Sequence, residues 1–346
     1  MKKKTVQPPP VRASRRGTGN TTLTDVARLA GVSAITVSRA LKRPAVVAPA
    51  TLARIHDAVA RTGYVPNLMA GGLASNRSGL IAALVPTVAG SVFLDTVQAL
   101  TDACDEAGCQ LILGQSGYTG FREDALINAI VGRRPDGIVL TGIMHSTEGR
   151  RKLLASGIPV VETWDLTPTP IDMLVGFSHE RVGTEVADFL YRRGYRHPAM
   201  VTADDYRAGL RRSGFEARMR SLGVDVVNIR MVSAPTTLQH GREGYAALLA
   251  EGVPVDVVFC SSDVLAQGVM TEAQARGLRV PDDIGVMGFG DLAYASFLHP
   301  ALTTVHIDGK TIGQQAAQFI FDRIEGRDVA ERIRDIGFSL VVRDSV

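Results

Sequence analysis

The chain has 346 residues, more than one compact core usually covers, so we expect more than one folding unit. Its bulk charge of +3 hides an asymmetry: residues 1–79 carry 13 Lys and Arg against two acids, whereas the remainder carries 25 against 33. The head is therefore +11 and the body −8, which localises attraction for a polyanion to one end. A basic disordered tail is the alternative interpretation.

Cysteine usage and hydropathy exclude several classes of protein. Cys104, Cys109 and Cys260 are odd in number and lack metal-ligand spacing, so we expect free thiols, a reducing compartment and no metal site. No stretch approaches 18 uninterrupted apolar residues, which predicts no membrane span. The N-terminus is rich in Lys, Pro and Arg and does not have the form of a signal peptide, so we expect a cytoplasmic protein.

Residues 21–65 predict an all-α module. Thr22 with Asp25 three residues later has the form of a capping box at the start of a first helix. Gly31 ends that helix, and Ser33 can cap a second one. A third helix follows before Gly63, and short helices joined by a tight turn predict a helix-turn-helix module.

The segments on either side of this module have little to bury. Residues 1–20 are rich in Pro, Gly and basic side chains, which predicts a disordered arm. Residues 66–78 can open a short helix at Pro66, but Gly71 and Gly72 each weaken it by about 1 kcal/mol relative to alanine. We therefore expect a linker that becomes ordered only when something holds it.

From residue 79 to 346, short apolar strands alternate with amphipathic helices. This order predicts parallel sheets covered on both faces, and it repeats once along the chain, so we expect two α/β lobes with a ligand cleft between them. One large α/β domain is the alternative. The expected strands are Leu80–Val85, Gln110–Gly114, Gly137–Thr141, Pro159–Glu162, Ala199–Val201, Val226–Val232, Val257–Cys260, Ile284–Gly288, Ala301–Ile307 and Phe338–Val342.

Several motifs carry a family resemblance over about 320 residues. The sequence of residues 22–42, TLTDVARLAGVSAITVSRALK, resembles the LacI family of bacterial repressors. The similarity continues through the motifs GYVPN, PDGI, GIPVV, FCSSD, LRVPDD and PALTTV. Within that family the chain is most similar to gluconate-operon repressors, through Val161-Glu162, DMLVGF at 172–177 and IGFSL at 336–340.

The resemblance implies a fold and lobe boundaries. The expected fold is a small all-α helix-turn-helix head on an α/β two-lobed core like that of periplasmic binding proteins. The expected N-lobe covers about 79–177 and 308–330, and the expected C-lobe covers about 178–307 and 331–346.

The resemblance also implies how the head would read DNA. The second helix would lie in the major groove, with Ala34, Ile35 and Arg39 facing base edges. Arg39 can pair with guanine O6 and N7, whereas Ala34 and Ile35 can only touch a thymine methyl group. Leu73 would wedge between base steps in the minor groove. The remaining expected DNA contacts, some of which also suit helix capping, are Thr22, Leu23, Ser33, Thr36, Ser38 and Asn67.

A sugar acid bound in the cleft needs an apolar platform, hydrogen bonds for its hydroxyls and a cation for its carboxylate. Phe93 and Trp164 are the candidate platforms, although Phe93 also suits the core. Arg207 and Arg211 lie where relatives bind polar effectors, although Arg211 also suits a solvated helix face. Asp263 and Asp291 follow strands and can accept hydroxyls, although Asp291 also suits a helix cap. His179 is expected at the surface or the hinge.

These observations together predict a sequence-specific transcriptional repressor. We expect a homodimer on a near-palindromic operator, released by gluconate or a related sugar acid acting as inducer. A corepressor-dependent repressor and a sugar-binding transport protein are the alternatives. No catalytic constellation is visible, and residues 309–311 do not complete a P-loop, because position 304 is Thr instead of Gly. Residues 288–293 fit a loose dinucleotide fingerprint, but they come near the end of the fold and the resemblance assigns this loop to the effector cleft, so we expect neither an enzyme nor a cofactor.

Overall fold

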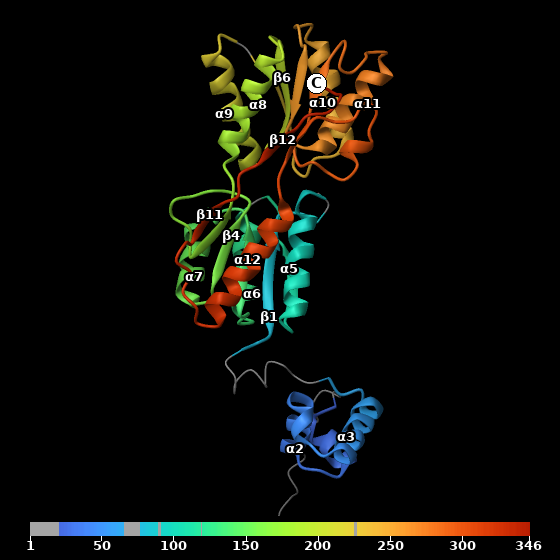
Figure 1. The fold of residues 1–346 in the computed structure, drawn as a ribbon, viewed down its shortest axis with the longest axis vertical. Coiled ribbons are helices and arrows are strands. Elements are labelled where there is room, and N and C mark those ends of the chain that lie inside the picture. The colour runs from blue at the N-terminus through green and yellow to red at the C-terminus, as the bar shows by residue number, and fades with distance from the viewer. Residues whose placement is uncertain (1–20, 66–76, 89–90, 119, 225–226) are drawn as a thin grey trace, which may run out of the picture. The chain divides into compact units, whose positions relative to one another are not determined.

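The computed structural model describes residues 21–65, 77–88, 91–118, 120–224 and 227–346 (Figure 1). The chain divides into two compact units, Met1–Ser75 and Asn76–Val346. The expected arm at 1–20 and most of the expected linker, including Asn67 and Leu73, lie outside the described residues. No helix within the described ranges is long and apolar enough to cross a membrane.

The first unit is the predicted helical module. Its helices are α1 (Leu23–Ala30), α2 (Ala34–Lys42) and α3 (Pro49–Thr62), with the short 3-10 helix η1 (Pro44–Val46) between the last two. Gly31 has a φ of 66°, a left-handed conformation that glycine adopts without strain, and this allows the tight turn between α1 and α2.

Local capping and a small core hold this module together. Thr22 and Asp25 form the predicted capping box, with each side chain bonded to the other's backbone N–H. Ser33 caps α2 by accepting from the Thr36 N–H at 3.2 Å. Val26, Val37 and Ile55, one from each helix, are fully buried and form the centre of the core. The helix-turn-helix prediction is therefore confirmed.

The N-lobe of the second unit contains a parallel sheet in the order β11-β5-β4-β3-β1-β2. Figure 1 shows helices α5 and α12 in front of this sheet. The strands are β1 (Leu80–Val85), β2 (Gln110–Gln115), β3 (Gly137–Thr141), β4 (Val160–Thr163), β5 (Met173–Gly176) and β11 (Ile333–Asp335). The helices are η2 (Ser91–Phe93), α5 (Leu94–Glu106), α6 (Gly120–Val131), α7 (Thr147–Ser156) and α12 (Gly309–Ile324).

The C-lobe contains a parallel sheet in the order β7-β6-β8-β9, with β10 and β12 paired antiparallel beside it. Its strands are β6 (Pro198–Ala203), β7 (Asn228–Val232), β8 (Val257–Cys260), β9 (Gly285–Met287), β10 (Thr304–His306) and β12 (Ser339–Val341). Its helices are α8 (His179–Arg192), α9 (Tyr206–Ser221), α10 (Leu238–Ala250), α11 (Asp263–Ala275) and η3 (Ala295–Phe297).

Glycines allow the C-lobe helices to pack in close pairs, α8 with α9 and α10 with α11. A Cβ at Gly214 would lie 2.2 Å from the backbone oxygen of Glu180, and a Cβ at Gly268 would lie 2.2 Å from that of Leu238. Backbone at this distance leaves no room for any side chain. The α8–α9 pair matters for function, because α9 carries the arginines discussed below.

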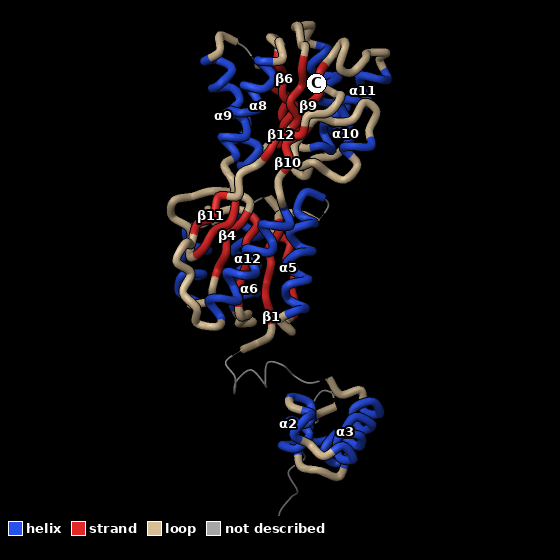
Figure 2. Tube along the Cα trace, viewed as in Figure 1, coloured by secondary structure: helices blue, strands red, loops and turns tan. Residues whose placement is uncertain are grey.

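The chain passes between the lobes in segments that Figure 2 shows as loops, after β5, after β10 and after β11. The expected start of the last C-lobe segment at 331 is wrong, because Ile333–Asp335 (β11) pairs in parallel with β5 in the N-lobe sheet. This short strand is largely exposed and mixes Ile with Arg and Asp, so it has no apolar run to identify it. The more apolar β5 was also absent from the expected strands.

Candidate functional site

The outward face of α2 carries the side chains expected to read DNA. Ile35 is 71% exposed, and Arg39, one helical turn later, is also exposed. Within the described residues Arg39 makes no hydrogen bond or ion pair, so its guanidinium donors are available. The helix contains no acidic residue. This face suits a polyanion, and base reading by Arg39 stays a prediction.

Several of the other expected DNA contacts in the head also have structural roles. Thr22 and Ser33 cap helices α1 and α2. The hydroxyls of Ser33 and Thr36 lie 2.8 Å apart. Leu23 is half-buried against the core of the head, and Ala34 also packs there. Helix caps leave hydroxyls and N–H groups at a helix start, where phosphates are favoured, so both roles remain compatible.

A cavity lies between the lobes of the body. Its empty space is about 760 Å³, which includes space open to the solvent. The residues that follow β1, β4, β6 and β8 reach it, as expected for ligand sites at the carboxyl ends of parallel strands. We call it the first cavity. Its lining residues are Thr87, Val92, Phe93, Tyr118, Trp164, His179, Ala203, Asp205, Arg207, Arg211, Ala234, Pro235, Thr236, Ser261, Ser262, Val264, Phe289 and Leu292.

Both predicted aromatic platforms line this cavity. Trp164 packs edge-on against Phe93, with ring centroids 5.0 Å apart, and its indole N–H donates to Thr96 Oγ1 at 3.0 Å. Trp164 has a φ of 64°, which is unusual for a bulky residue and indicates that its surroundings fix it. Packing and a hydrogen bond therefore hold the ring at the cavity wall.

Both predicted arginines line the cavity as well. Arg211 is buried, with its Cζ 4.0 Å from the Phe289 ring centroid and its Nη2 donating to the Ser261 carbonyl at 3.1 Å. Arg207 lies 5.1 Å over the Phe93 ring. Arg207 Nη1 and Arg211 Nε are buried without a hydrogen-bond partner. Unpaired buried guanidinium donors are costly, so both suit an anion that this site would bind.

His179 is not at the surface; it begins α8, directly after the segment that passes between the lobes behind β5, where the hinge was the other expected place. It is buried and lines the first cavity. Its Nδ1 lies 2.8 Å from Arg211 Nη1, and its Nε2 lies 2.9 Å from the Trp164 carbonyl oxygen. A guanidinium can only donate and a carbonyl can only accept, so Nδ1 is the acceptor and Nε2 carries the proton. Burial, together with the cationic arginines, holds the pKa of His179 well below its usual value. The neutral ring therefore orients Arg211.

Asp263 and Asp291 do not line the cavity, contrary to expectation. The Asp263 carboxylate is fully buried and accepts from Thr304 Oγ1 at 2.6 Å and from the Leu292 N–H at 2.7 Å. Burial raises the pKa of Asp263 to about 6. Asp291 binds Arg343 at 2.7 Å and His306 at 3.0 Å. Both carboxylates therefore hold loops of the C-lobe in place.

Sequence reasoning missed several cavity residues. Ser261 and Ser262 belong to the recognised FCSSD motif and directly follow a buried strand, a signal that was assigned to Asp263 instead. Phe289 follows β9 in the same way. Asp205 caps α9 by accepting from the Arg207 and Ala208 N–H groups. Tyr118 follows β2 and had no distinguishing pattern in the sequence.

The sequence matches two family descriptions. Residues 22–67 match the bacterial regulatory proteins of the lacI family, and residues 187–346 match a periplasmic binding protein-like domain. The chain is 37% identical over 332 residues to the HTH-type transcriptional regulator GntR of Pseudomonas aeruginosa, covering 95% of this chain and 97% of that protein. It is 31% identical over 319 residues to GntR of Escherichia coli K12, covering 92% and 96%.

Solved structures support the same fold. A LacI-family transcriptional regulator from Silicibacter pomeroyi is 32% identical, covers 94% of this chain and 99% of its own, and has a TM-score of 0.88. The Lac repressor dimer bound to operator and the anti-inducer ONPF is 24% identical, with 94% and 99% covered and a TM-score of 0.79. At that identity the second likeness shows the fold alone.

Proposed function

The chain belongs to the LacI family of DNA-binding transcriptional regulators, and from this premise we propose that a sugar acid bound in the first cavity controls its binding to an operator. Proteins of this family bind operator DNA and small-molecule effectors, and the relatives are regulators rather than enzymes. The effector we propose is gluconate or a closely related acid acting as inducer. The resemblance to gluconate-operon repressors favours this choice.

The observation that carries the proposal is the pair of arginines in the first cavity. Arg207 and Arg211 come from one helix of the C-lobe and each has a buried N–H without a partner. A carboxylate would satisfy both, and Phe93 with Trp164 offers apolar surface to the carbon chain of the acid. Serine and threonine hydroxyls in the lining, Ser262 and Thr236 among them, would pair with the hydroxyl groups nearest its carboxylate.

Release from DNA requires that the effector favours one arrangement of the lobes. The cavity walls come from both lobes, with Arg207 on the C-lobe facing Phe93 on the N-lobe. A ligand touching both walls changes the free energy of lobe closure by as much as it prefers one state. We propose that this change reaches the operator through a homodimer, in which paired heads bind a near-palindromic site with Arg39 reading bases and Leu73 in the minor groove.

The test is operator binding with and without gluconate. A duplex selected from a random library by the full-length protein serves as operator, and its affinity is measured by fluorescence anisotropy. We expect gluconate at saturation to weaken operator binding at least tenfold. Unchanged affinity in the presence of every sugar acid tried would sink the proposal, and strengthened affinity would replace induction with corepression.

Arginine variants test whether the response to gluconate arises in the first cavity. Arg207→Ala removes a cavity guanidinium and is expected to abolish the response to gluconate while leaving operator affinity intact. Arg212→Ala is the matched control on the same helix, because Arg212 pairs with Glu216 and does not line the cavity. Loss of both operator binding and response in Arg207→Ala would assign that residue a folding role instead.

A further inference from the structure

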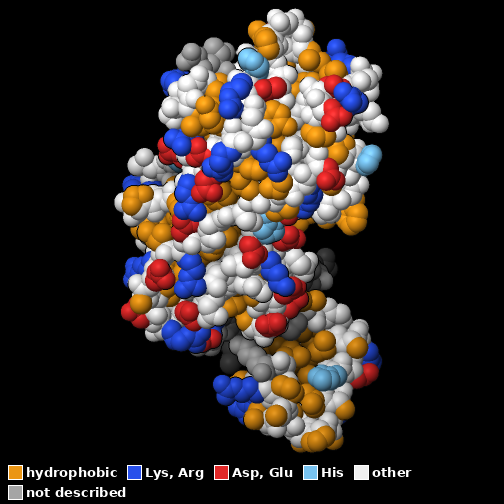
Figure 3. All heavy atoms as spheres, turned by 45° about the horizontal axis from the view of Figure 1, so that its top comes forward, with side chains coloured by type: hydrophobic (Ala, Val, Ile, Leu, Met, Phe, Trp, Pro, Cys, Tyr) orange, Lys and Arg blue, Asp and Glu red, His pale blue; other side chains and the backbone are white. Residues whose placement is uncertain are grey.

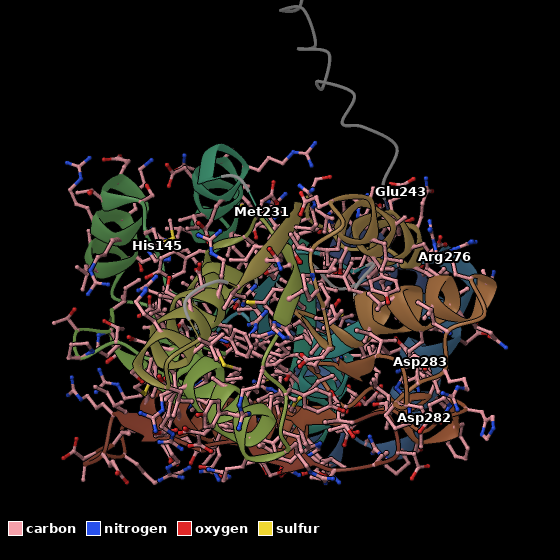
Figure 4. The ribbon with its side chains drawn as sticks, turned by 90° about the horizontal axis from the view of Figure 1, so that it is seen from above. His145, Met231, Glu243, Arg276, Asp282 and Asp283 are labelled. Atoms are coloured by element: carbon pink, nitrogen blue, oxygen red, sulfur yellow. The ribbon has the colours of Figure 1, made fainter. Side chains whose placement is uncertain are left out.

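A second cavity adjoins the first and shares Tyr118, Asp205 and Arg207 with it. Its N-lobe wall follows β1, β2, β3 and β4, and its C-lobe wall is the start of α9. At this wall the lobes meet through the rings of His145 and Tyr206, whose centroids lie 4.3 Å apart. In Figure 4, seen from the C-lobe end, His145 lies on the side opposite Asp282 and Asp283.

Arg207 stands at the junction of the two cavities. One side of its guanidinium faces Phe93 of the first cavity. Its unpaired Nη1 approaches Gly142 of the second cavity, where an added Cβ would lie 3.6 Å away. A carboxylate held at Arg207 and Arg211 can therefore send the rest of its chain into the second cavity.

The charged side chains that line this second cavity are mostly carboxyl groups. Glu123, Asp165 and Asp205 line it, and Arg207 is the sole Lys or Arg among the lining residues that the structure describes. Asp165 is only 3% exposed; its Oδ1 accepts from the Leu166 N–H at 2.9 Å, whereas its Oδ2 is buried without a partner. A buried oxygen without a donor is costly, so Asp165 Oδ2 lacks a hydrogen-bond donor that a ligand would bring.

The backbone explains why Asp165 faces this cavity. Trp164 lines the first cavity and Asp165 lines the second, although they are consecutive. The left-handed conformation of Trp164 turns the chain between them, and Gly176 lets the Asp165 backbone pack closely, since a Cβ there would lie 2.0 Å from the Asp165 carbonyl oxygen. Burial raises the pKa values of Asp165 and Glu123, because it disfavours their charged forms.

We propose that the second cavity holds the hydroxyl-bearing tail of the sugar acid and rejects a phosphate at that end. Hydroxyl groups donate hydrogen bonds to Asp165 Oδ2 and Glu123, and satisfy them. A phosphate monoester is mostly doubly charged at neutral pH and in that form has no hydrogen-bond donor, so it meets repulsion from the same carboxylates. The inference rests on the proposed function and restricts its effector to an unphosphorylated polyhydroxy acid.

Calorimetric titration of the full-length protein with gluconate and with 6-phosphogluconate tests the inference. We expect gluconate to bind at least tenfold more tightly. In the double variant Glu123→Gln, Asp165→Asn, we expect gluconate to bind more weakly and 6-phosphogluconate more tightly, so that the ratio of their dissociation constants falls at least fivefold. Opposite changes in the two ligands are not produced by a general loss of folding.

A control variant and a second test variant complete the experiment. Glu185→Gln removes one carboxylate from an exposed ion pair on α8 and should leave the ratio unchanged. Glu123→Gln alone, at a half-buried helical position, provides the test if the double variant melts at a lower temperature than the unmodified protein. Equal affinities for the two acids, or an unchanged ratio in the variants, would overturn this inference and leave the proposed function standing. If neither acid binds, both fall.

Discussion

The head and the inter-lobe cavity present their functional side chains in opposite ways. In the head, Ile35 and Arg39 lie one turn apart on a nine-residue helix, and both are exposed. In the body, Arg211 and His179 are buried and come from different helices. An exposed face on one helix can be altered without disturbing the fold, whereas each cavity residue also supports its neighbours.

Charge follows the same division. The basic residues of the head lie in a part of the sequence with few acidic residues, so acidic neighbours do not cancel its attraction for DNA. On the face of the body shown in Figure 3, basic and acidic side chains are interspersed. Exposed ion pairs such as Arg279 with Asp282 contribute little to stability, typically about 0–1 kcal/mol. The candidate ligand-binding groups of the body are buried, whereas the candidate DNA-reading groups of the head are exposed.

The largest loss of stability that we expect comes from a substitution in the core of the head. Ile55→Ala removes a fully buried side chain from a core of only three short helices, and should lower its free energy of unfolding by about 3–4 kcal/mol. Operator binding is expected to disappear while gluconate still raises the melting temperature of the body, as measured by calorimetry. Leu29→Ala, at an exposed position of α1, is the control. If both units lost their transitions together, they would not be independent.

A smaller loss of stability is expected from a substitution at the contact between helices α8 and α9. Gly214→Ala places a methyl group 2.2 Å from the Glu180 carbonyl oxygen, so the helices must separate, at a cost of about 2–3 kcal/mol. The displacement moves Arg211 and should weaken gluconate binding as well as stability. Gly209→Ala, in the same helix with no atom within 4 Å, should instead be neutral or stabilising by up to about 1 kcal/mol. Chemical denaturation of both variants compares the two.

A change at Arg39 should affect recognition without affecting folding. Arg39→Ala is expected to lose about 2 kcal/mol of discrimination at one operator position, because alanine cannot bond guanine O6 and N7. Binding to a set of single-base operator variants measures this loss, and Arg28→Ala, whose guanidinium pairs with Asp25, serves as the control. An equal fall in affinity for all sequences would make Arg39 a phosphate contact.

The smallest effect is expected at a helix cap. Ser33→Ala removes the acceptor for the Thr36 N–H and should destabilise the head by about 1 kcal/mol. If Ser33 also contacts phosphate, operator affinity will fall by more than the loss of stability explains. Thr24→Ala, at an exposed position within α1 that caps nothing, should change stability by less than about 0.5 kcal/mol.

The sequence by itself determined the head, because its signals are local. The Thr22–Asp25 capping box, the turn at Gly31 and the cap at Ser33 each depend on residues within a few positions of one another. The same holds for strands with a continuous apolar run, and Leu80–Val85, Gly137–Thr141 and Val257–Cys260 have the predicted bounds. Phe93, Trp164, Arg207 and Arg211 were identified as cavity candidates from residue type and family position.

Only the tertiary structure decided which polar residues remain available to a ligand. Asp263 and Asp291 looked like sugar-binding carboxylates, but their partners Thr304 and Arg343 lie more than 40 positions along the chain. His179 is buried and neutral, and its two ring nitrogens are bound to Arg211 and to the Trp164 carbonyl oxygen. A carboxylate or imidazole is free or occupied depending on groups that folding brings to it, and sequence spacing does not encode those distances.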